Sequence, residues 1–370
     1  MKRYLLLFLS VSLLISSCTE TNPSGPDPDD FDRKAILENW ADNIIIPALT
    51  DFSEKTESLK TAGNNFAGNP DQQALEALRD SWKAGYLAWQ QVSMFETPKT
   101  MEIRFRNNLN IYPVDTAEVK ENIGQGEYNL NLPSQIDQQG FPALDYLLYG
   151  LAESDSEILA FYNSGENSSD YRNYVVDLVT RIDSLTDIVL NDWNSSYRHE
   201  FVNNSGNGAN SSIDMMVNDY IFYYEKNLRA GKIGIPAGVF SGTPLPQNVE
   251  GVYSREFSKE LFLESLTATQ NFFNGKHFNS ETTGSSLSNY LDFLNTIKNG
   301  TDLTQLINQQ FEASRTKAQN LNSSFVDQVE TNNSLMLQTY DELQKNVILM
   351  KVDMLQALNI NVDYVDADGD

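Results

Sequence analysis

One segment, GFPALDYLLYG at residues 140–150, contains the residues best placed to do chemistry. Its glycine and proline predict that a helix begins here, which puts Asp145 in the first helical turn. A carboxylate in this position complements the helix dipole, so Asp145 could simply stabilise the helix end. Alternatively, it is a functional carboxylate held at a rigid helix start beside a cleft.

Oxygen is the only metal-binding atom that the side chains supply in quantity. The chain has 51 acidic residues and 17 tyrosines, but two histidines and one cysteine. Neither histidine lies in a His-Glu-x-x-His motif, and zinc would prefer imidazole or thiolate ligands. A cofactor, if there is one, is therefore iron or another hard cation bound by oxygen. Asp145 and Asp115 are the candidate ligands, and Tyr112 adds a hydroxyl close to Asp115.

Four basic residues near the candidate loops, Arg104, Arg106, Arg229 and Lys232, stand out in this acidic chain. They could line a cleft for an anionic ligand such as a chelated iron complex, since guanidinium groups bind carboxylates in bidentate fashion. The alternative is that each pairs with an acidic residue across a domain interface. The formal net charge of -25 argues against a nucleic-acid partner, which requires clustered basic residues.

The N-terminus has the pattern of a bacterial lipoprotein signal. Two basic residues precede an apolar run at 4–15, and small residues stand directly before Cys18, the single cysteine. We expect residues 1–17 to be a signal peptide and Cys18 to carry lipid, which would attach the protein to a membrane. An ordinary secretory signal is the alternative. Residues 18–32, rich in Pro, Asp and Ser, are expected to be a flexible tether.

Helices must position these residues, because apolar side chains recur every three or four positions after the tether. The pattern predicts an all-α protein of two helical-bundle domains packed against each other, at 33–240 and 241–370. The expected helices are at about 33–60, 71–96, 168–194, 211–230, 255–273, 286–299, 302–323 and 325–359. Asn69 is expected to cap the helix at 71–96, Ser154 with Glu157 to cap a further short helix, and Pro47 to kink or end the first helix. Long loops are expected at 107–139 and 232–251.

Six stretches in order resemble the imelysin family of bacterial secreted and lipid-anchored proteins. They are NWADNIIIPA (39–48), WKAGYLAWQQVSMFETP (82–98), NLNIYPVD (108–115), GFPALDYLLYG (140–150), NLRAGKIGIPAG (227–238) and LMKVDMLQALNINVDYVDADGD (349–370). The resemblance implies two helical bundles with a site in the cleft between them. It also implies either a metallopeptidase or a role in iron uptake.

The chain departs from the family at its hallmark motif, Gly-x-His-x-x-Glu. Gly140 matches the glycine, but Pro142 replaces the histidine and Asp145 replaces the glutamate. The favoured hypothesis is therefore a cell-envelope lipoprotein of iron uptake, on the periplasmic or outer-membrane face. It would bind iron, an iron chelate or a partner protein of the uptake system in the cleft. A metallopeptidase and a partner-docking lipoprotein are the alternatives. The acidic tail Asp366–Asp370 resembles only the start of a calcium loop.

Overall fold

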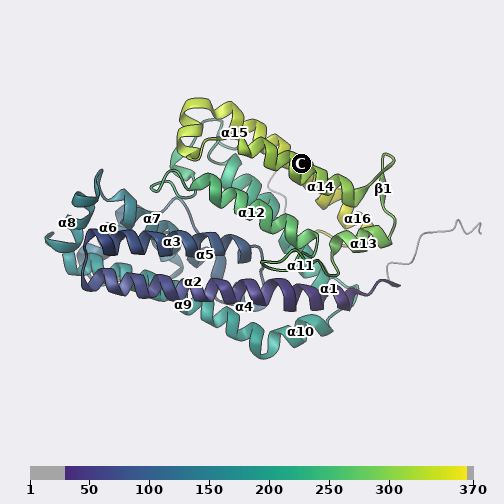
Figure 1. Ribbon diagram of the computed structural model, residues 1–370, viewed down its shortest axis with the longest axis horizontal. Helices are drawn as coiled ribbons and strands as arrows, with labels where there is room; N and C mark the ends of the chain where they lie inside the picture. Colours follow the sequence, from purple (N-terminus) through teal and green to yellow (C-terminus); the bar gives the residue numbers. More distant parts are fainter. Residues whose placement is uncertain (1–29, 365–370) are drawn as a thin grey trace, which may run out of the picture.

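The computed structural model describes residues 30–364 (Figure 1). The predicted signal peptide, Cys18, most of the tether and the tail Asp366–Asp370 lie outside the described residues. The described part confirms the all-α prediction, because its only strands form one short hairpin, β1 (Ile297–Lys298) with β2 (Thr301–Asp302). None of the described helices combines the length and the apolar character needed to cross a bilayer.

The first group of helices is built around α2 (Ile46–Gly68), α3 (Gln72–Val92) and α9 (Ser168–Asp192), which pack side by side (Figure 1). The predicted spacing in α3 is confirmed, since Trp82 and Trp89 both lie in the core. The N-cap is Asp71, whose carboxylate accepts from the Ala74 N–H at 2.9 Å. A cap at Asn69 was the wrong prediction, because that asparagine caps the preceding helix at its C-terminal end.

The second group contains α12 (Ser258–Phe273), α14 (Leu303–Gln319) and α15 (Phe325–Val347), which continues into η8 (Ile348–Met354) and α16 (Leu355–Leu358). Helix α12 packs on both α14 and α3, so one continuous apolar core joins the two groups. This is the predicted arrangement of two packed bundles. The π-helical segment η6 (Tyr223–Gly234) packs mainly on α15, within the second group. The boundary at residue 240 stays a prediction.

Shorter helices complete the fold. They are α1 (Arg33–Asn39), α4 (Pro98–Glu102), α5 (Phe105–Leu109), α6 (Thr116–Gln125), α7 (Gly140–Asp145), α8 (Asp155–Asn163), α10 (Arg198–Asn203), α11 (Ser212–Phe222) and α13 (Leu287–Phe293). Two 3₁₀ turns, η3 (Pro133–Gln138) and η7 (Pro246–Asn248), lie in the connections. Further π-helical segments are η2 (Trp40–Ile45), η4 (Tyr146–Gly150) and η5 (Trp193–Tyr197). Such segments often mark functional positions, and η4 and η6 both adjoin the predicted site.

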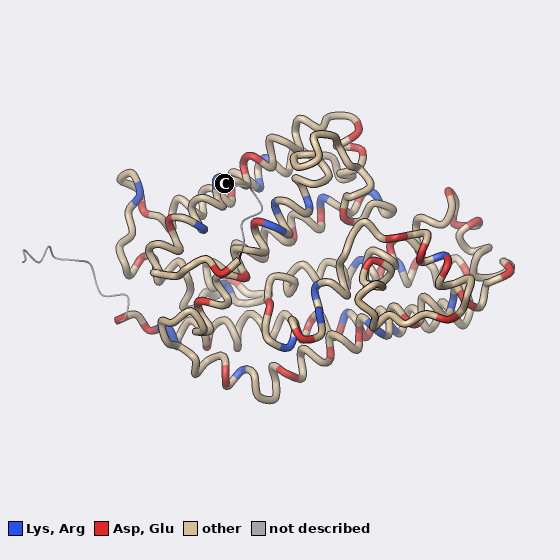
Figure 2. Tube along the Cα trace, turned by 180° about the vertical axis from the view of Figure 1, so that it is seen from behind, with Lys and Arg blue, Asp and Glu red and all other residues tan. Residues whose placement is uncertain are grey.

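Three element predictions are corrected. The helix expected at 286–299 ends at Phe293, because Asn295, directly after the C-cap Leu294, takes a left-handed conformation with φ 50°. Asn299 and Gly300, with φ values of 53° and 80°, then form the β1–β2 turn. The loop expected from residue 232 begins after Gly234, and the loop expected at 107–139 contains α6. Acidic residues are spread over both groups of helices (Figure 2).

Candidate functional site

Helix α7, which carries the hallmark positions, begins at a glycine that no other residue could replace without strain. Gly140 has φ +76°, and a Cβ atom there would lie 2.2 Å from the carbonyl oxygen of Leu109. The next residue, Phe141, stacks on the ring of Tyr86 with centroids 4.7 Å apart, and its carbonyl accepts from Trp82 Nε1 at 3.1 Å. These contacts fix α7 in the core, so Pro142 is buried there.

Asp145 was expected in the first turn of this helix, but it is the last residue of α7, and its carboxylate holds a loop. It is 1% exposed, and its two oxygens accept from the backbone N–H groups of Tyr253 and Ser254, both at 2.9 Å. Burial raises the pKa of Asp145 to about 7, although these hydrogen bonds act to lower it, and the negative charge of Glu250 adds to the rise. Asp145 therefore connects α7 to the segment that leads into α12.

A buried ion pair between Lys232 and Glu250 lies at the junction of the two groups of helices, where their side chains are 4% and 3% exposed. The Lys232 ammonium also donates to Gln90 Oε1 at 2.9 Å. Glu250 accepts from Asn110 Nδ2 at 2.8 Å, and Tyr86 donates to Asn110 Oδ1 at 2.6 Å. Residues from α3, the α5–α6 connection, η6 and the loop after it thus meet in one network, which we call the junction network.

The junction network continues into α12 and η6 through hydroxyl groups. Ser265 Oγ donates to Gln90 Oε1 at 2.7 Å, and Ser93 Oγ donates to the Tyr223 hydroxyl at 2.7 Å. Tyr112 lies beside the network: a Cβ atom on Gly231 would be 3.3 Å from its hydroxyl. Burial and the charge of Glu250 raise the pKa of Tyr112 well above its ordinary value. Tyr112 is therefore a neutral phenol here.

Of the predicted cleft residues, the structure brings Tyr112, Lys232 and Asp145 around Glu250. Gly140 and Pro142 are buried in α7, and Asp115, Arg104 and Arg229 lie elsewhere. Asp115 is the N-cap of α6 and accepts from the N–H groups of residues 117 and 118 at 3.0 Å. Arg104 is exposed at the start of α5. Arg229 is buried over the ring of Tyr340, 4.5 Å from its centroid, and donates to Gln344.

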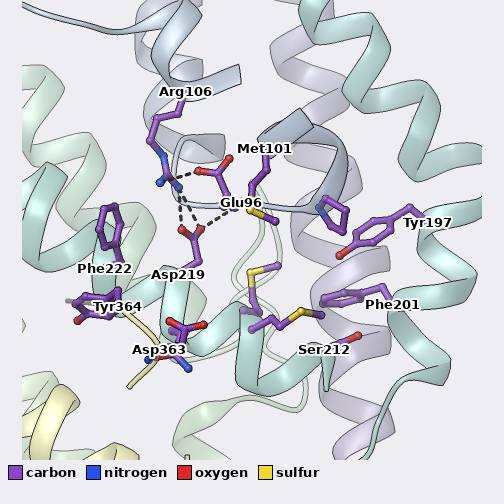
Figure 3. Close-up of a pocket in the computed structure, with 14 residues that line it drawn as sticks. Glu96, Met101, Arg106, Tyr197, Phe201, Ser212, Asp219, Phe222, Asp363 and Tyr364 are labelled. Atoms are coloured by element: carbon purple, nitrogen blue, oxygen red, sulfur yellow. Dashed lines mark hydrogen bonds and ion pairs between the residues drawn. The ribbon is translucent and has the colours of Figure 1, made fainter. Parts of the chain in front are cut away.

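A cavity of about 310 Å³ opens beside this network, between α4, α10, α11 and residues Asp363–Tyr364 (Figure 3). One end of it carries three charged residues: Arg106 pairs with Glu96 at 2.9 Å and with Asp219 at 3.1 Å. Arg106 Nε also donates to the Ser93 carbonyl at 2.9 Å, which connects this cluster to the junction network. Burial raises the pKa of Asp219 to about 6 despite the nearby arginine, and Glu96 adds to the rise.

The residues at the hallmark positions do not fit a metal ion. Pro142 offers no side-chain ligand, and both oxygens of Asp145 accept from peptide N–H groups. Within residues 30–364, no three His, Cys, Asp or Glu side chains come together as a metal-binding group. The carboxylates nearest to Asp145 and Arg106 are already paired, so a hydrolytic metal centre has no ligand set at this motif.

Glu250, Gln90 and Asn110 were missed from the sequence as site residues. Gln90 lies on the predicted helix of α3, and Glu250 lies in a predicted loop, so neither position carries a local signal for the other. They meet because α12 packs on α3 and brings the preceding loop with it. Asp219 was missed for the same reason, since Arg106 is 113 residues away in sequence.

The fold and the site define an all-α protein of two packed helical groups with a polar network at their junction. The model of the imelysin family (Peptidase_M75) matches residues 45–348, and the chain belongs to this family. Comparison with curated proteins found no match.

Two solved structures share the fold. One, from Parabacteroides distasonis ATCC 8503, bears the name of an iron-regulated protein A precursor; it is 17% identical with a TM-score of 0.70, over 89% of this chain and 96% of that one. The other is an imelysin-like protein from Psychrobacter arcticum 273-4, 16% identical with a TM-score of 0.69, over 90% of this chain and 97% of that one. The similarity of both extends over nearly the whole fold.

Proposed function

We propose that this imelysin-family protein is a lipid-anchored protein of the bacterial cell envelope that serves iron acquisition by binding a ligand, and that it does not cleave peptides. The observation that carries the proposal is that both carboxylate oxygens of Asp145 are already hydrogen-bonded to the backbone. A catalytic metal site would need that carboxylate as a ligand or base, whereas both of its oxygens accept from the peptide N–H groups of residues 253 and 254.

Two further points support a binding role in iron acquisition. The solved structure from Parabacteroides distasonis is named for iron regulation, and the signal sequence before Cys18 is typical of a bacterial lipoprotein. The cavity bounded by α4, α10 and α11 offers a place for a ligand, because its volume of about 310 Å³ reaches the lower end of small-molecule sites, ~300–1,000 Å³.

The basic residues first considered for an anionic iron chelate favour a different ligand. Lys232 is paired with Glu250, and Arg106 is paired with two carboxylates. Neither has charge to spare for a further anion. A ligand of the cavity is therefore expected to be neutral or positively charged.

Growth of the native host under iron limitation tests the proposed role. We expect deletion of the gene to slow growth in chelator-treated medium, and the wild-type gene to restore it. Met101→Trp, which fills the cavity from an exposed position, should fail to restore growth, whereas Val352→Trp, at an exposed position outside the cavity lining, should succeed. Equal growth of the deletion strain and the parent at every chelator concentration would rule out the role in iron acquisition.

A further inference from the structure

The cavity beside Arg106 carries more negative than positive charge. Four charged residues line it, Glu96, Asp219 and Asp363 with Arg106, and among the described lining residues Arg106 is the only Lys or Arg. Lys351 pairs with Glu225 and does not line the cavity, although its ammonium lies over the Tyr364 ring, 5.1 Å from the centroid. With all three carboxylates ionised, the lining is two negative charges in excess.

The buried part of this cluster lacks one positive charge. The side chains of Glu96, Arg106 and Asp219 are only 21%, 14% and 13% exposed, and one guanidinium must balance two carboxylates. Water is largely excluded there, so an unbalanced charge is costly. Burial, and after it the negative charge of Glu96, raises the pKa of Asp219 to about 6, so a proton on Asp219 is one way to correct the imbalance. A bound cation is another.

The remaining walls of the cavity consist mainly of aromatic and methionine side chains, which are suited to an organic cation. Tyr197 and Phe201 line one side in Figure 3, and Phe222 and Tyr364 line the opposite side. Aromatic faces attract a cation through the ring quadrupole, most strongly when the cation is desolvated. Three methionines, Met101, Met215 and Met216, supply flexible apolar surface that adapts to the body of a ligand.

The wall formed by Asp363 and Tyr364 is held in place by the fold. The Asp363 N–H donates to Asn218 Oδ1 at 3.2 Å, and the Tyr364 ring meets Phe222 edge-on, with centroids 5.3 Å apart. The Tyr364 hydroxyl also donates to Glu225 at 3.0 Å. This segment, which is distant in sequence from α4 and α10, therefore closes one side of the cavity with an aromatic ring and a carboxylate.

We propose that this cavity binds a small organic ammonium ion, in which a positively charged amine is attached to an apolar body. The amine lies toward the carboxylates, and the body lies between the aromatic and methionine side chains. This inference rests on the proposed binding function, whose ligand class it names. It excludes anionic ligands, including negatively charged iron chelates, from this cavity.

A matched series of three ligands tests the charge requirement: 3-phenylpropylamine, 3-phenylpropan-1-ol and 3-phenylpropanoate, which differ in little besides the end group. The Cys18→Ser chain, which has no lipid, would be labelled with ¹³C on its methionine methyl groups and titrated by NMR. Met101, Met215 and Met216 report from the cavity, while the buried Met350 and Met354 serve as internal controls. We expect the amine to shift the cavity methyls with a Kd at least tenfold below that of the alcohol, and the carboxylate to shift none.

Two variants that each remove one negative charge, one inside the cavity lining and one outside it, test whether the lining charge matters. Asp363→Asn removes an exposed carboxylate at the cavity, so we expect weaker amine binding by threefold or more and unchanged alcohol binding. Glu330→Gln, at an exposed position outside the cavity lining, should change neither. Equal affinity for amine and alcohol, or preferred binding of the carboxylate, would overturn the proposal. If the gene deletion had no effect on iron-limited growth, this proposal would still stand, because the titration measures ligand binding directly.

Discussion

Asp145 lies 2.9 Å from the backbone nitrogen of Tyr253, across 108 residues of sequence, and the other oxygen of the same carboxylate meets the next N–H group. The side chain at the family's glutamate position thus joins the two groups of helices. Most of what we predict for this protein follows from that contact and from the buried ion pair beside it.

Asp145→Asn is expected to lower the free energy of unfolding by about 1–3 kcal/mol at pH 5, because an amide can accept only one of the two hydrogen bonds and leaves a buried N–H group unpaired. Urea unfolding measures the change. An unaltered midpoint and slope would show that the two hydrogen bonds contribute nothing to the fold.

The difference between wild type and Asp145→Asn should also depend on pH. The pKa of Asp145 is raised from 3.8 to about 7 in the folded state, so the folded protein binds the proton more tightly than the unfolded chain does. The stability that Asp145 contributes is therefore present below pH ~4 and is lost as the pH rises to about 7. The variant has no carboxyl group to titrate here, so the difference in free energy of unfolding between wild type and variant should shrink between pH 5 and pH 8. A difference that grows over this range would contradict the raised pKa.

The Lys232–Glu250 pair should be sensitive to loss of either partner. Lys232→Met or Glu250→Gln leaves one buried group without its partner, and each should cost about 3–5 kcal/mol in unfolding experiments. Lys232→Met combined with Glu250→Leu should recover most of the loss. The control is Asp327→Asn, which removes an exposed ion pair with Arg255. The Arg255 side chain is 53% exposed and the Asp327 side chain 46%, so this pair should contribute under about 1 kcal/mol. Similar losses at both pairs would show that burial is not the cause.

Two glycines with positive φ separate steric conflict from backbone strain. Gly140→Ala should destabilise the protein by well over the ~1–2 kcal/mol of left-handed strain, because its Cβ would lie 2.2 Å from the Leu109 carbonyl oxygen. Gly126→Ala has φ +67° but open space around the Cβ, so it should show the strain alone. Thermal melts compare the two, and equal losses would argue against the close approach of α5 to α7.

The fold class could be predicted because helix periodicity is a local property. Residues 168–194 show the spacing of α9, and Ser154 with Glu157 forms the predicted capping box at α8. Single residues that usually end or kink a helix were less reliable predictors, because packing contacts also decide whether the helix continues. Pro47 was expected to kink or end its helix; instead the π-helical segment η2 precedes it, and the chain continues as α2 with Pro47 in its first turn.

The site was less predictable, since its residues come together only through packing. Tyr112 and Lys232 lie around the same residue, Glu250, but Glu250 itself lies in a loop without a motif. Arg229 has the same sequence neighbourhood as Lys232, yet it turns toward α15 and stacks on Tyr340. Arg229 and Lys232 are three positions apart on the π-helical segment η6. The α-helical spacing used for prediction cannot say which face of such a segment each residue occupies.

Lipid attachment is tested at Cys18, which lies outside the described residues. We expect the native protein to sediment with membranes and to stay there after a high-salt wash, and Cys18→Ser to appear in the soluble fraction. Membrane association of the variant after the same wash would rule out the lipid as the anchor.

The most direct test of the central claim is peptide cleavage by the purified full chain, supplied in turn with Zn²⁺, Fe²⁺ and Ca²⁺ and incubated with a mixed peptide library. We predict no cleavage above that of a heat-denatured sample with any of these ions, because the hallmark carboxylate is hydrogen-bonded to the loop at residues 253–254. Cleavage that a chelator abolishes, and that Asp145→Asn also abolishes without unfolding the protein, would contradict it.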